Sequence, residues 1–150
     1  MKRQDFFSVL KESFIKINPT SRNVELFDNI LQGFDDFEII DSFYQIKKSE
    51  KEQGLALEAM FFNKIVIIDL VFSRSIIDYT SVLINKINHI QYSIDTTSSS
   101  NEAGELSVLD NLEMTISYGG DQRSLVYRCE TKRLPELLKI RNKIFSLCES

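Results

Sequence analysis

The chain has 150 residues, of which 43% are hydrophobic and 27% are charged, with only 5 Gly and 2 Pro. Its length fits one domain with a core of its own, and its composition excludes collagen-like, low-complexity and disordered chains. The formal net charge of −4 disfavours a general nucleic-acid binder, because such a surface repels polyanions at long range.

No segment of the sequence indicates secretion or membrane insertion. Met1 to Asp5 lead into Phe6 without the apolar stretch of a secretory signal, and charged residues interrupt the most apolar run, Leu55 to Phe72. We therefore expect a soluble cytoplasmic protein. Cys129 and Cys148 are too few and too separated for a disulfide framework or a metal site. The prediction is two buried free thiols, no metal and no cofactor.

The first 33 residues predict a helical hairpin. Apolar residues recur at helical spacing between residues 5 and 17, and Asn18-Pro19 ends that helix. A second helix is expected from a cap at Thr20 or Ser21 to a left-handed stop at Gly33. We predict residues 1–33 as an appendage to a domain over residues 34–150, because a hairpin of this size cannot bury a core alone.

Strand patterns dominate the middle of the chain. Seven strands are predicted between Phe37 and Glu130, with cores near residues 37–46, 55–62, 65–72, 75–82, 89–95, 112–118 and 125–129. Asn63-Lys64 predicts a tight hairpin, Lys47 to Gly54 a charged loop, and Thr96 to Gly104 a mobile loop. Between strands four and five, residues 83–88 are irregular.

A final amphipathic helix is predicted from about Arg133 to Cys148. Its apolar stripe is formed by Leu134, Leu137, Leu138, Ile144, Phe145 and Cys148. Such a stripe requires a partner surface, which the open end of an antiparallel sheet offers. The predicted fold class is therefore α+β: an antiparallel seven-stranded barrel or strongly bent sheet, capped by a C-terminal helix and preceded by a two-helix hairpin.

The segment from Ile76 to Tyr92 resembles the middle of a pleckstrin-homology-like domain. In that fold a strand ends in a lysine, isoleucine, polar, polar, isoleucine step, and Lys86-Ile87-Asn88-His89-Ile90 has this form. The helix after strand seven is similar too. The resemblance covers residues 37–148 and implies a seven-stranded barrel, a scaffold that more often binds than catalyses.

Two sets of basic residues are candidates for a partner surface: Lys47, Lys48 and Lys51 in the first loop, and Lys139, Arg141 and Lys143 on the last helix. Phosphoinositide-binding members of the superfamily use a basic first hairpin, which implies weak binding to a membrane surface as one alternative. Here Glu50 and Glu52 offset the loop lysines, and the next strand lacks the basic residues of a phosphate clamp. A membrane partner is therefore not expected. The basic residues of the last helix either face an acidic partner or suit the helix dipole.

Catalytic constellations are scarce. His89 is the only histidine and lies on the polar face of its strand, with no nucleophile motif nearby. The acidic cluster Asp35, Asp36, Glu38 and Asp41 does not match calcium-loop spacing. A small-molecule-binding protein or enzyme would have to use strand carboxylates such as Glu58, Asp69 or Asp78, whose pKa burial would raise.

The sequence thus favours a non-enzymatic protein–protein interaction module. Its partner is expected to be a protein, with self-association as a further option, because the phenylalanines of the hairpin can exceed what the sheet buries. The small-molecule or enzyme reading and weak lipid binding are the alternatives. The most informative surfaces are expected in the hairpin before Phe37 and in the 47–54 and 96–104 loops.

Overall fold

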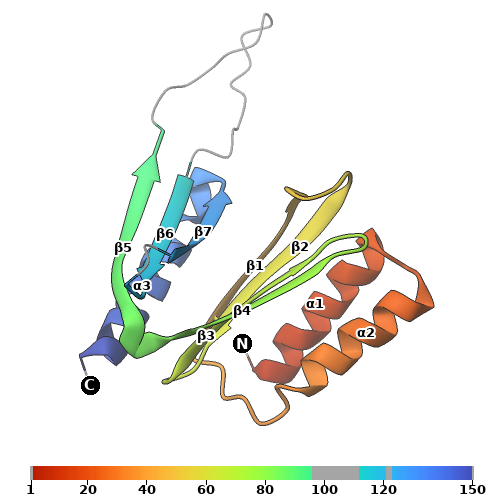
Figure 1. Ribbon diagram of the computed structural model, residues 1–150, viewed down its shortest axis with the longest axis horizontal. Helices are drawn as coiled ribbons and strands as arrows, with labels where there is room; N and C mark the ends of the chain where they lie inside the picture. Colours follow the sequence, from red (N-terminus) through yellow and green to blue (C-terminus); the bar gives the residue numbers. More distant parts are fainter. Residues whose placement is uncertain (1, 96–111, 121–122, 150) are drawn as a thin grey trace, which may run out of the picture. The chain divides into compact units, whose positions relative to one another are not determined.

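The structure is a computed structural model that describes residues 2–95, 112–120 and 123–149. It divides into two compact units, Met1–Leu83 and Ile84–Ser150. The fold is α+β, with three α-helices and two antiparallel sheets of four and three strands (Figure 1). This confirms the predicted fold class at that level. The described strands form two separate hydrogen-bonded sheets and no closed barrel.

The predicted helical hairpin is confirmed as α1 (Arg3–Ile17) and α2 (Ser21–Gln32). Thr20 takes the N-cap position of α2, one of the two predicted, but its hydroxyl donates to Asn18 Oδ1 at 3.2 Å and makes no cap bond. The predicted left-handed stop at the other end is wrong. Gly33 has a right-handed φ of −62°, because the chain continues in tight turns in which Gly33 N–H bonds back to Ile30 O at 3.1 Å.

Asn18, between the two helices, is a buried polar residue that joins distant parts of the first unit. It is 5% exposed, and its Nδ2 donates to Arg74 O at 2.8 Å, in the turn between the strands β3 (Val66–Phe72) and β4 (Ile77–Leu83). Its Oδ1 accepts from Asn23 Nδ2 at 3.1 Å. Because a buried amide without partners is costly, these bonds fix the helical hairpin against that turn.

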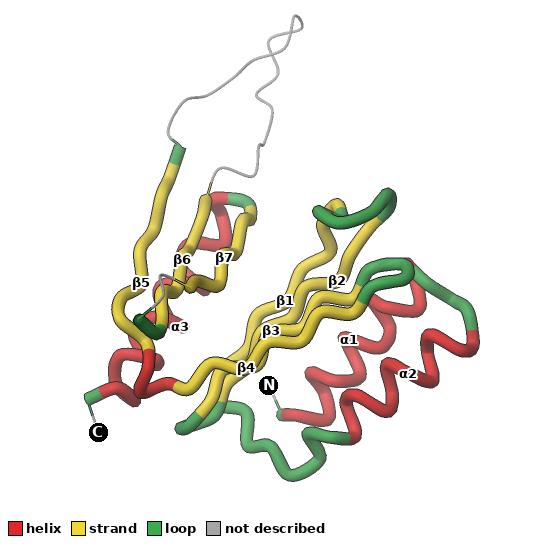
Figure 2. Tube along the Cα trace, viewed as in Figure 1, coloured by secondary structure: helices red, strands yellow, loops and turns green. Residues whose placement is uncertain are grey.

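The sheet of the first unit is a meander in the order β1-β2-β3-β4, formed by β1 (Asp41–Lys48), β2 (Leu55–Phe62), β3 (Val66–Phe72) and β4 (Ile77–Leu83). Helices α1 and α2 lie side by side along one face of it (Figures 1 and 2). The predicted hairpin at Asn63 is confirmed, and its Oδ1 accepts the backbone N–H groups of Ile65 and Val66, each at 2.8 Å. A side-chain acceptor of this kind stabilises a turn without a glycine.

Aromatic packing between the helices and the sheet forms the core of the first unit. Phe14 stacks on Phe27 with ring centroids 4.7 Å apart, and both contact Phe72 of β3. The described cluster comprises Phe6, Leu10, Phe14, Phe27, Leu31 and Phe34 from the hairpin segment, with Leu57, Ala59, Phe61, Ile68, Leu70 and Phe72 from the sheet. The hairpin therefore supplies half of the side chains in this core.

β2 is buried on both of its faces. Every residue after Leu55 is buried, and the register places Met60 and Phe62 on the face opposite the helices, beside Phe43 and Ile67. Antiparallel strands with one wet face normally alternate between apolar and polar side chains. The sequence of β2, which is apolar except for Glu58, instead fits a central strand.

The second unit contains the 3₁₀ turn η1 (Ile84–Lys86), the strands β5 (Ile87–Ile94), β6 (Leu112–Tyr118) and β7 (Arg123–Cys129), the 3₁₀ turn η2 (Thr131–Arg133) and α3 (Leu134–Cys148). The sheet order is β5-β6-β7. Its apolar face carries Ile90, Tyr92, Leu112, Met114, Ile116, Leu125, Tyr127 and Cys129. Tyr92 Oη donates to Leu137 O at 2.9 Å, which places α3 on this face.

Several predicted boundaries shift in the structure. The first strand begins at Asp41 rather than Phe37, because Phe37 packs edge-on against Phe34 and Phe61 instead of joining the sheet. Cys129 is buried as predicted, whereas Cys148, at the last residue of α3, is exposed. The predicted 96–104 loop lies outside the described residues.

Replacing Phe27 with Ala should destabilise the protein by about 3 to 5 kcal/mol, because the change leaves a cavity between Phe14 and Phe72. Urea unfolding followed by circular dichroism measures the loss. The matched control is Leu26→Ala on the same helix, where the side chain is 43% exposed and the expected loss is below about 1 kcal/mol. Equal losses in the two variants would contradict the assigned core.

Candidate functional site

The strand β4 is an exposed sheet edge with apolar side chains. Its only sheet neighbour among the described residues is β3, and no other hydrogen bond to a described residue occupies its outer backbone groups. Ile77, Tyr79 and Leu83 are 37%, 51% and 48% exposed. The register places all three on one face of the sheet, the face whose centre α1 and α2 cover. An edge of this kind is a template for another strand.

Tyr79 is held at this edge by a ring contact. Its ring stacks on Phe34 with centroids 5.8 Å apart and an interplanar angle of 18°. Half of the residue remains exposed in spite of this contact. A rigid aromatic side chain next to open backbone groups loses little conformational entropy on binding, which suits an interface anchor.

The loop between β1 and β2 is held against the turn between β3 and β4. Ser49 Oγ lies 3.2 Å from Ser73 Oγ, and Glu52 accepts the N–H and hydroxyl of Ser75 at 2.7 and 2.5 Å. The Ser75 hydroxyl, followed by its N–H, holds the pKa of Glu52 below its ordinary value of 4.5. Gly54 closes the loop at φ 103°, a conformation that other residues adopt only with strain.

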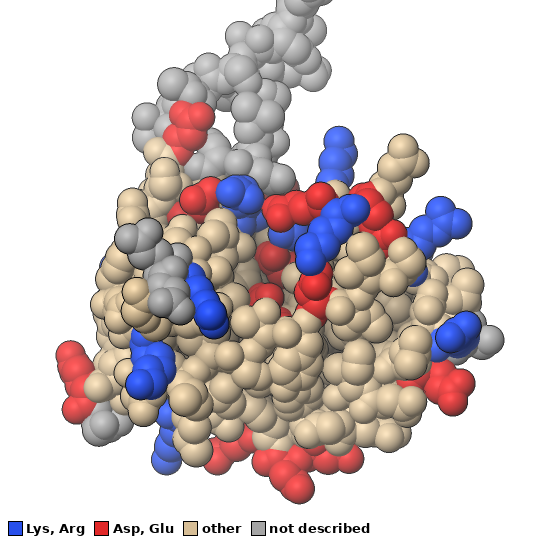
Figure 3. Space-filling view, viewed as in Figure 1, with Lys and Arg blue, Asp and Glu red and all other residues tan. Residues whose placement is uncertain are grey.

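The structure separates the three loop lysines. Lys47 Nζ lies 2.8 Å from Glu58 Oε2, and Lys51 Nζ lies 3.0 Å from Asp78 Oδ1. Lys48 follows Lys47 directly and so points to the opposite face of β1. Acidic side chains lie among the basic ones around the tip of this hairpin (Figure 3). The geometry is that of separate ion pairs.

The candidate strand carboxylates share one face of the sheet but have separate surroundings. Glu58 is 3% exposed, and Gln45 Nε2 donates to its Oε1 at 2.8 Å while Lys47 occupies its other oxygen. The register places Val71 between Glu58 and Asp78, so these two carboxylates stand on strands roughly 10 Å apart. Asp69 pairs across the strands with different residues. Glu58 is therefore a structural ion-pair partner.

The basic residues of α3 lie on different sides of the helix. Lys139 and Lys143 are exposed and one turn apart, so they share a side. Arg141 instead lies over two aromatic rings, 5.8 Å from the centroid of Tyr92 and 5.9 Å from that of Phe145. Cation–π contacts hold its guanidinium close to the packed face of the helix.

Three remaining titratable residues of the second unit have clear surroundings. Burial raises the pKa of Tyr92, whose hydroxyl donates to the backbone of α3. Although Cys148 is exposed overall, partial desolvation of its sulfur, followed by the charge of Glu149, raises the pKa of its thiol, which makes it a weaker nucleophile at neutral pH. His89 is exposed on the outward face of β5, as the alternation of that strand predicts.

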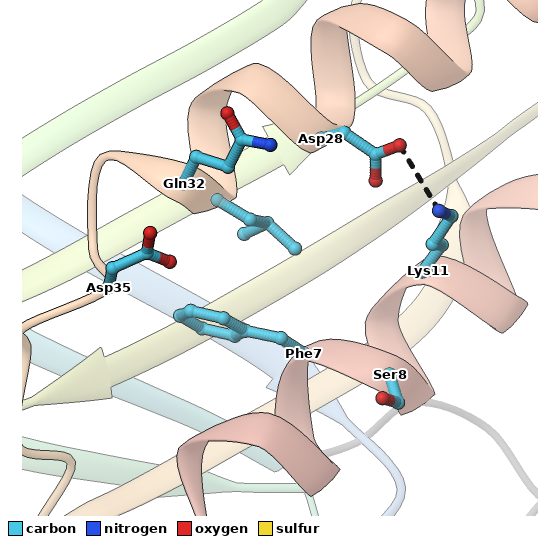
Figure 4. Close-up of a pocket in the computed structure, with 7 residues that line it drawn as sticks. Phe7, Ser8, Lys11, Asp28, Gln32 and Asp35 are labelled. Carbon is cyan, nitrogen blue, oxygen red and sulfur yellow. Dashed lines mark hydrogen bonds and ion pairs between the residues drawn. The ribbon is translucent and has the colours of Figure 1, made fainter.

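A groove of about 330 Å³ lies between α1 and α2 on their outer side (Figure 4). Its lining residues are Phe7, Ser8, Lys11, Asp28, Leu31, Gln32 and Asp35. The Lys11 to Asp28 ion pair, at 3.1 Å, bridges the helices at one end, while Phe7 and Asp35 lie toward the other. The sequence patterns did not single out this groove, because they do not show which helix residues face each other across a gap.

The β4 edge was also missed at the level of sequence. The apolar residues of the strand suggest burial, and only the sheet order shows that the strand is last in line. Its lack of lysine and proline, which natural edges use for protection, was the available signal. The predicted partner residues on α3 and in the first loop lie elsewhere in the chain.

Comparison with known proteins gives no assignment. No family model, curated protein sequence or solved structure matches the chain. Within the described residues, no group of three or more His, Cys, Asp or Glu side chains is placed to hold a metal ion. Across the same residues, none of the helices is long and apolar enough to span a membrane.

Replacing Lys47 with Met should destabilise the protein by about 3 to 5 kcal/mol, because it leaves the buried Glu58 carboxylate without its cation. The double variant Lys47→Met with Glu58→Leu should recover most of this loss. Urea unfolding of both single variants and the double variant gives the coupling energy. Additive losses would show that the pair does not act as a unit.

The pKa of Glu52, followed by NMR titration of its carboxyl carbon, should lie below 4.5 and should rise in Ser75→Ala, which removes the largest cause of the shift. Because the folded pKa is depressed, the contribution of this carboxylate to stability is present above pH 4.5 and is lost as the pH falls through the folded pKa. The control is Thr80→Ala in β4, which should leave the titration of Glu52 unchanged.

Proposed function

We propose that the protein is a non-enzymatic protein–protein interaction module, and that its β4 edge accepts the β4 strand of a second copy of the chain. The observation that carries the proposal is the combination of open backbone groups with three exposed apolar side chains on one edge strand. Strand addition uses these two features together, since the backbone supplies affinity and alternate side chains supply specificity.

The sequence of β4 supports pairing with itself. In an antiparallel arrangement centred on Thr80, Ile77 faces Leu83 of the second copy and Tyr79 faces its Ser81. This register pairs all seven residues of the strand and places an Ile77–Leu83 apolar pair at each end. Asp78 faces Val82, so the two Asp78 carboxylates are kept apart, whereas like charges directly opposite each other would destabilise the pair.

The interface is small, and we expect a weak dimer. One added strand buries less surface than the roughly 1,200 Å² of a standard stable interface, so association should depend on protein concentration. Exchange of subunits would then be fast, as in transient complexes.

The order of elements also supports the pleckstrin-homology-like interpretation as part of this proposal. Four strands form one meander, three form a second, and a helix follows the last strand. The resemblance implies seven strands followed by a helix, on a scaffold that more often binds than catalyses. Under this interpretation α1 and α2 are an addition before the first strand, and they lie beside the proposed interface.

The wild-type protein should show a concentration-dependent monomer–dimer equilibrium in sedimentation velocity, and Tyr79→Lys should shift it to monomer because the charge would be buried at the added strand. The matched control is Ile65→Lys, which alters a 67% exposed apolar residue in the turn between β2 and β3. It should leave the equilibrium unchanged. A wild-type protein that stays monomeric at millimolar concentration overturns the proposal.

Disulfide trapping tests the register. In a Cys148→Ser background, Thr80→Cys should cross-link under mild oxidation, because directly opposed residues have Cα atoms about 4.5 to 5.5 Å apart. Ser81→Cys is the control, since in this register it faces Tyr79 rather than itself. Faster cross-linking of Ser81→Cys than of Thr80→Cys would contradict the assigned pairing.

A further inference from the structure

We propose that the groove between α1 and α2 binds an organic cation: an ammonium or guanidinium group on a short aliphatic stem. The site is independent of the β4 edge. It combines an aromatic ring, an apolar floor and a carboxylate without an internal partner, all within one depression of about 330 Å³ (Figure 4).

The floor of the groove is apolar and packed against the core of the first unit. Phe7 is half-buried and held edge-on against Phe61 of β2 at a centroid distance of 5.6 Å, while Leu31 is 6% exposed. The ring of Phe7 therefore keeps its position without a ligand. A cation over such a ring gains from its quadrupole, and an aliphatic stem gains from contact with the apolar floor.

The charges of the groove leave one negative charge unbalanced. Lys11 pairs with Asp28 at 3.1 Å, which neutralises both. The Asp35 carboxylate is turned toward the groove, and it makes no hydrogen bond or ion pair with any residue the structure describes. The net charge of the lining is thus −1, and a ligand cation placed between Asp35 and Phe7 balances it.

The same charges argue against other ligand classes. An anion would meet the unpaired Asp35, and Lys11 cannot serve it without giving up Asp28. A neutral apolar ligand would gain from the floor but leave the carboxylate facing it. Gln32 adds an amide that can accept a hydrogen bond from an N–H donor at the rim. Donor-rich cations therefore fit best.

The direct test uses n-butylguanidinium, n-butylammonium and neutral n-butanol as probes in NMR titrations of the full chain. We expect saturable shifts of amide signals from α1 and α2 with both cations in the millimolar range, weakened by salt, and markedly smaller shifts with n-butanol. A capped Gly-Arg-Gly peptide distinguishes a peptide side chain from a free amine as the source of the cation.

Asp35→Asn should weaken binding of n-butylguanidinium by about two- to fivefold, in keeping with a solvent-accessible ion pair. Asp36→Asn is the matched control, because Asp36 is the adjacent exposed carboxylate and does not line the groove. Phe7→Leu keeps the apolar volume but removes the ring, and should cost a similar factor. Circular dichroism confirms that each variant is folded.

Three results would overturn the proposal. The first is the absence of saturable shifts with either cation. The second is equal binding of n-butanol and n-butylammonium, which would indicate a purely apolar contact. The third is an equal effect of Asp35→Asn and Asp36→Asn, which would indicate a general surface potential rather than a site.

Discussion

Burial of β2 on both faces is the constraint on which the first unit depends. Seven consecutive residues, from Ala56 to Phe62, are buried, and a sheet with one face open to solvent could not bury them all. The helical hairpin covers one face through Phe14 and Phe27, and its removal would expose a continuous apolar surface. The helices are therefore part of the fold, and the sheet could not keep its register without them.

This dependence explains where the chain leaves its surface open. The hairpin covers the centre of the sheet, so β4 lies toward the margin of that cover and retains exposed side chains at its edge. The same hairpin carries the groove on its outer side, away from the sheet. Both proposed binding features, the β4 edge and the groove, therefore depend on where the two helices cover the sheet.

Much of the element order follows from sequence periodicity, because each helix and strand repeats its own spacing. β2 was predicted as Leu55–Phe62 and β6 as Leu112–Tyr118, with the bounds that the structure has. Phe37 misled the prediction because its alternation resembles a strand, whereas ring packing on Phe34 sets its place. Composition changes near residue 33, but the compact units divide between Leu83 and Ile84. Edges and grooves are properties of assembled elements, so the sequence named Asp35 only as one of four acidic residues and gave for Tyr79 only the absence of lysine and proline from its strand.

The buried amide of Asn18 links the order of folding to the sequence. Its bond to Arg74 O spans 56 residues, and it cannot form until β3 and β4 have met in their turn. Closing a loop of this length costs entropy, which the bonds of the buried amide help to offset. The docking of the helical hairpin is therefore coupled to the turn between β3 and β4, and a change that disturbs that turn also loosens the helices.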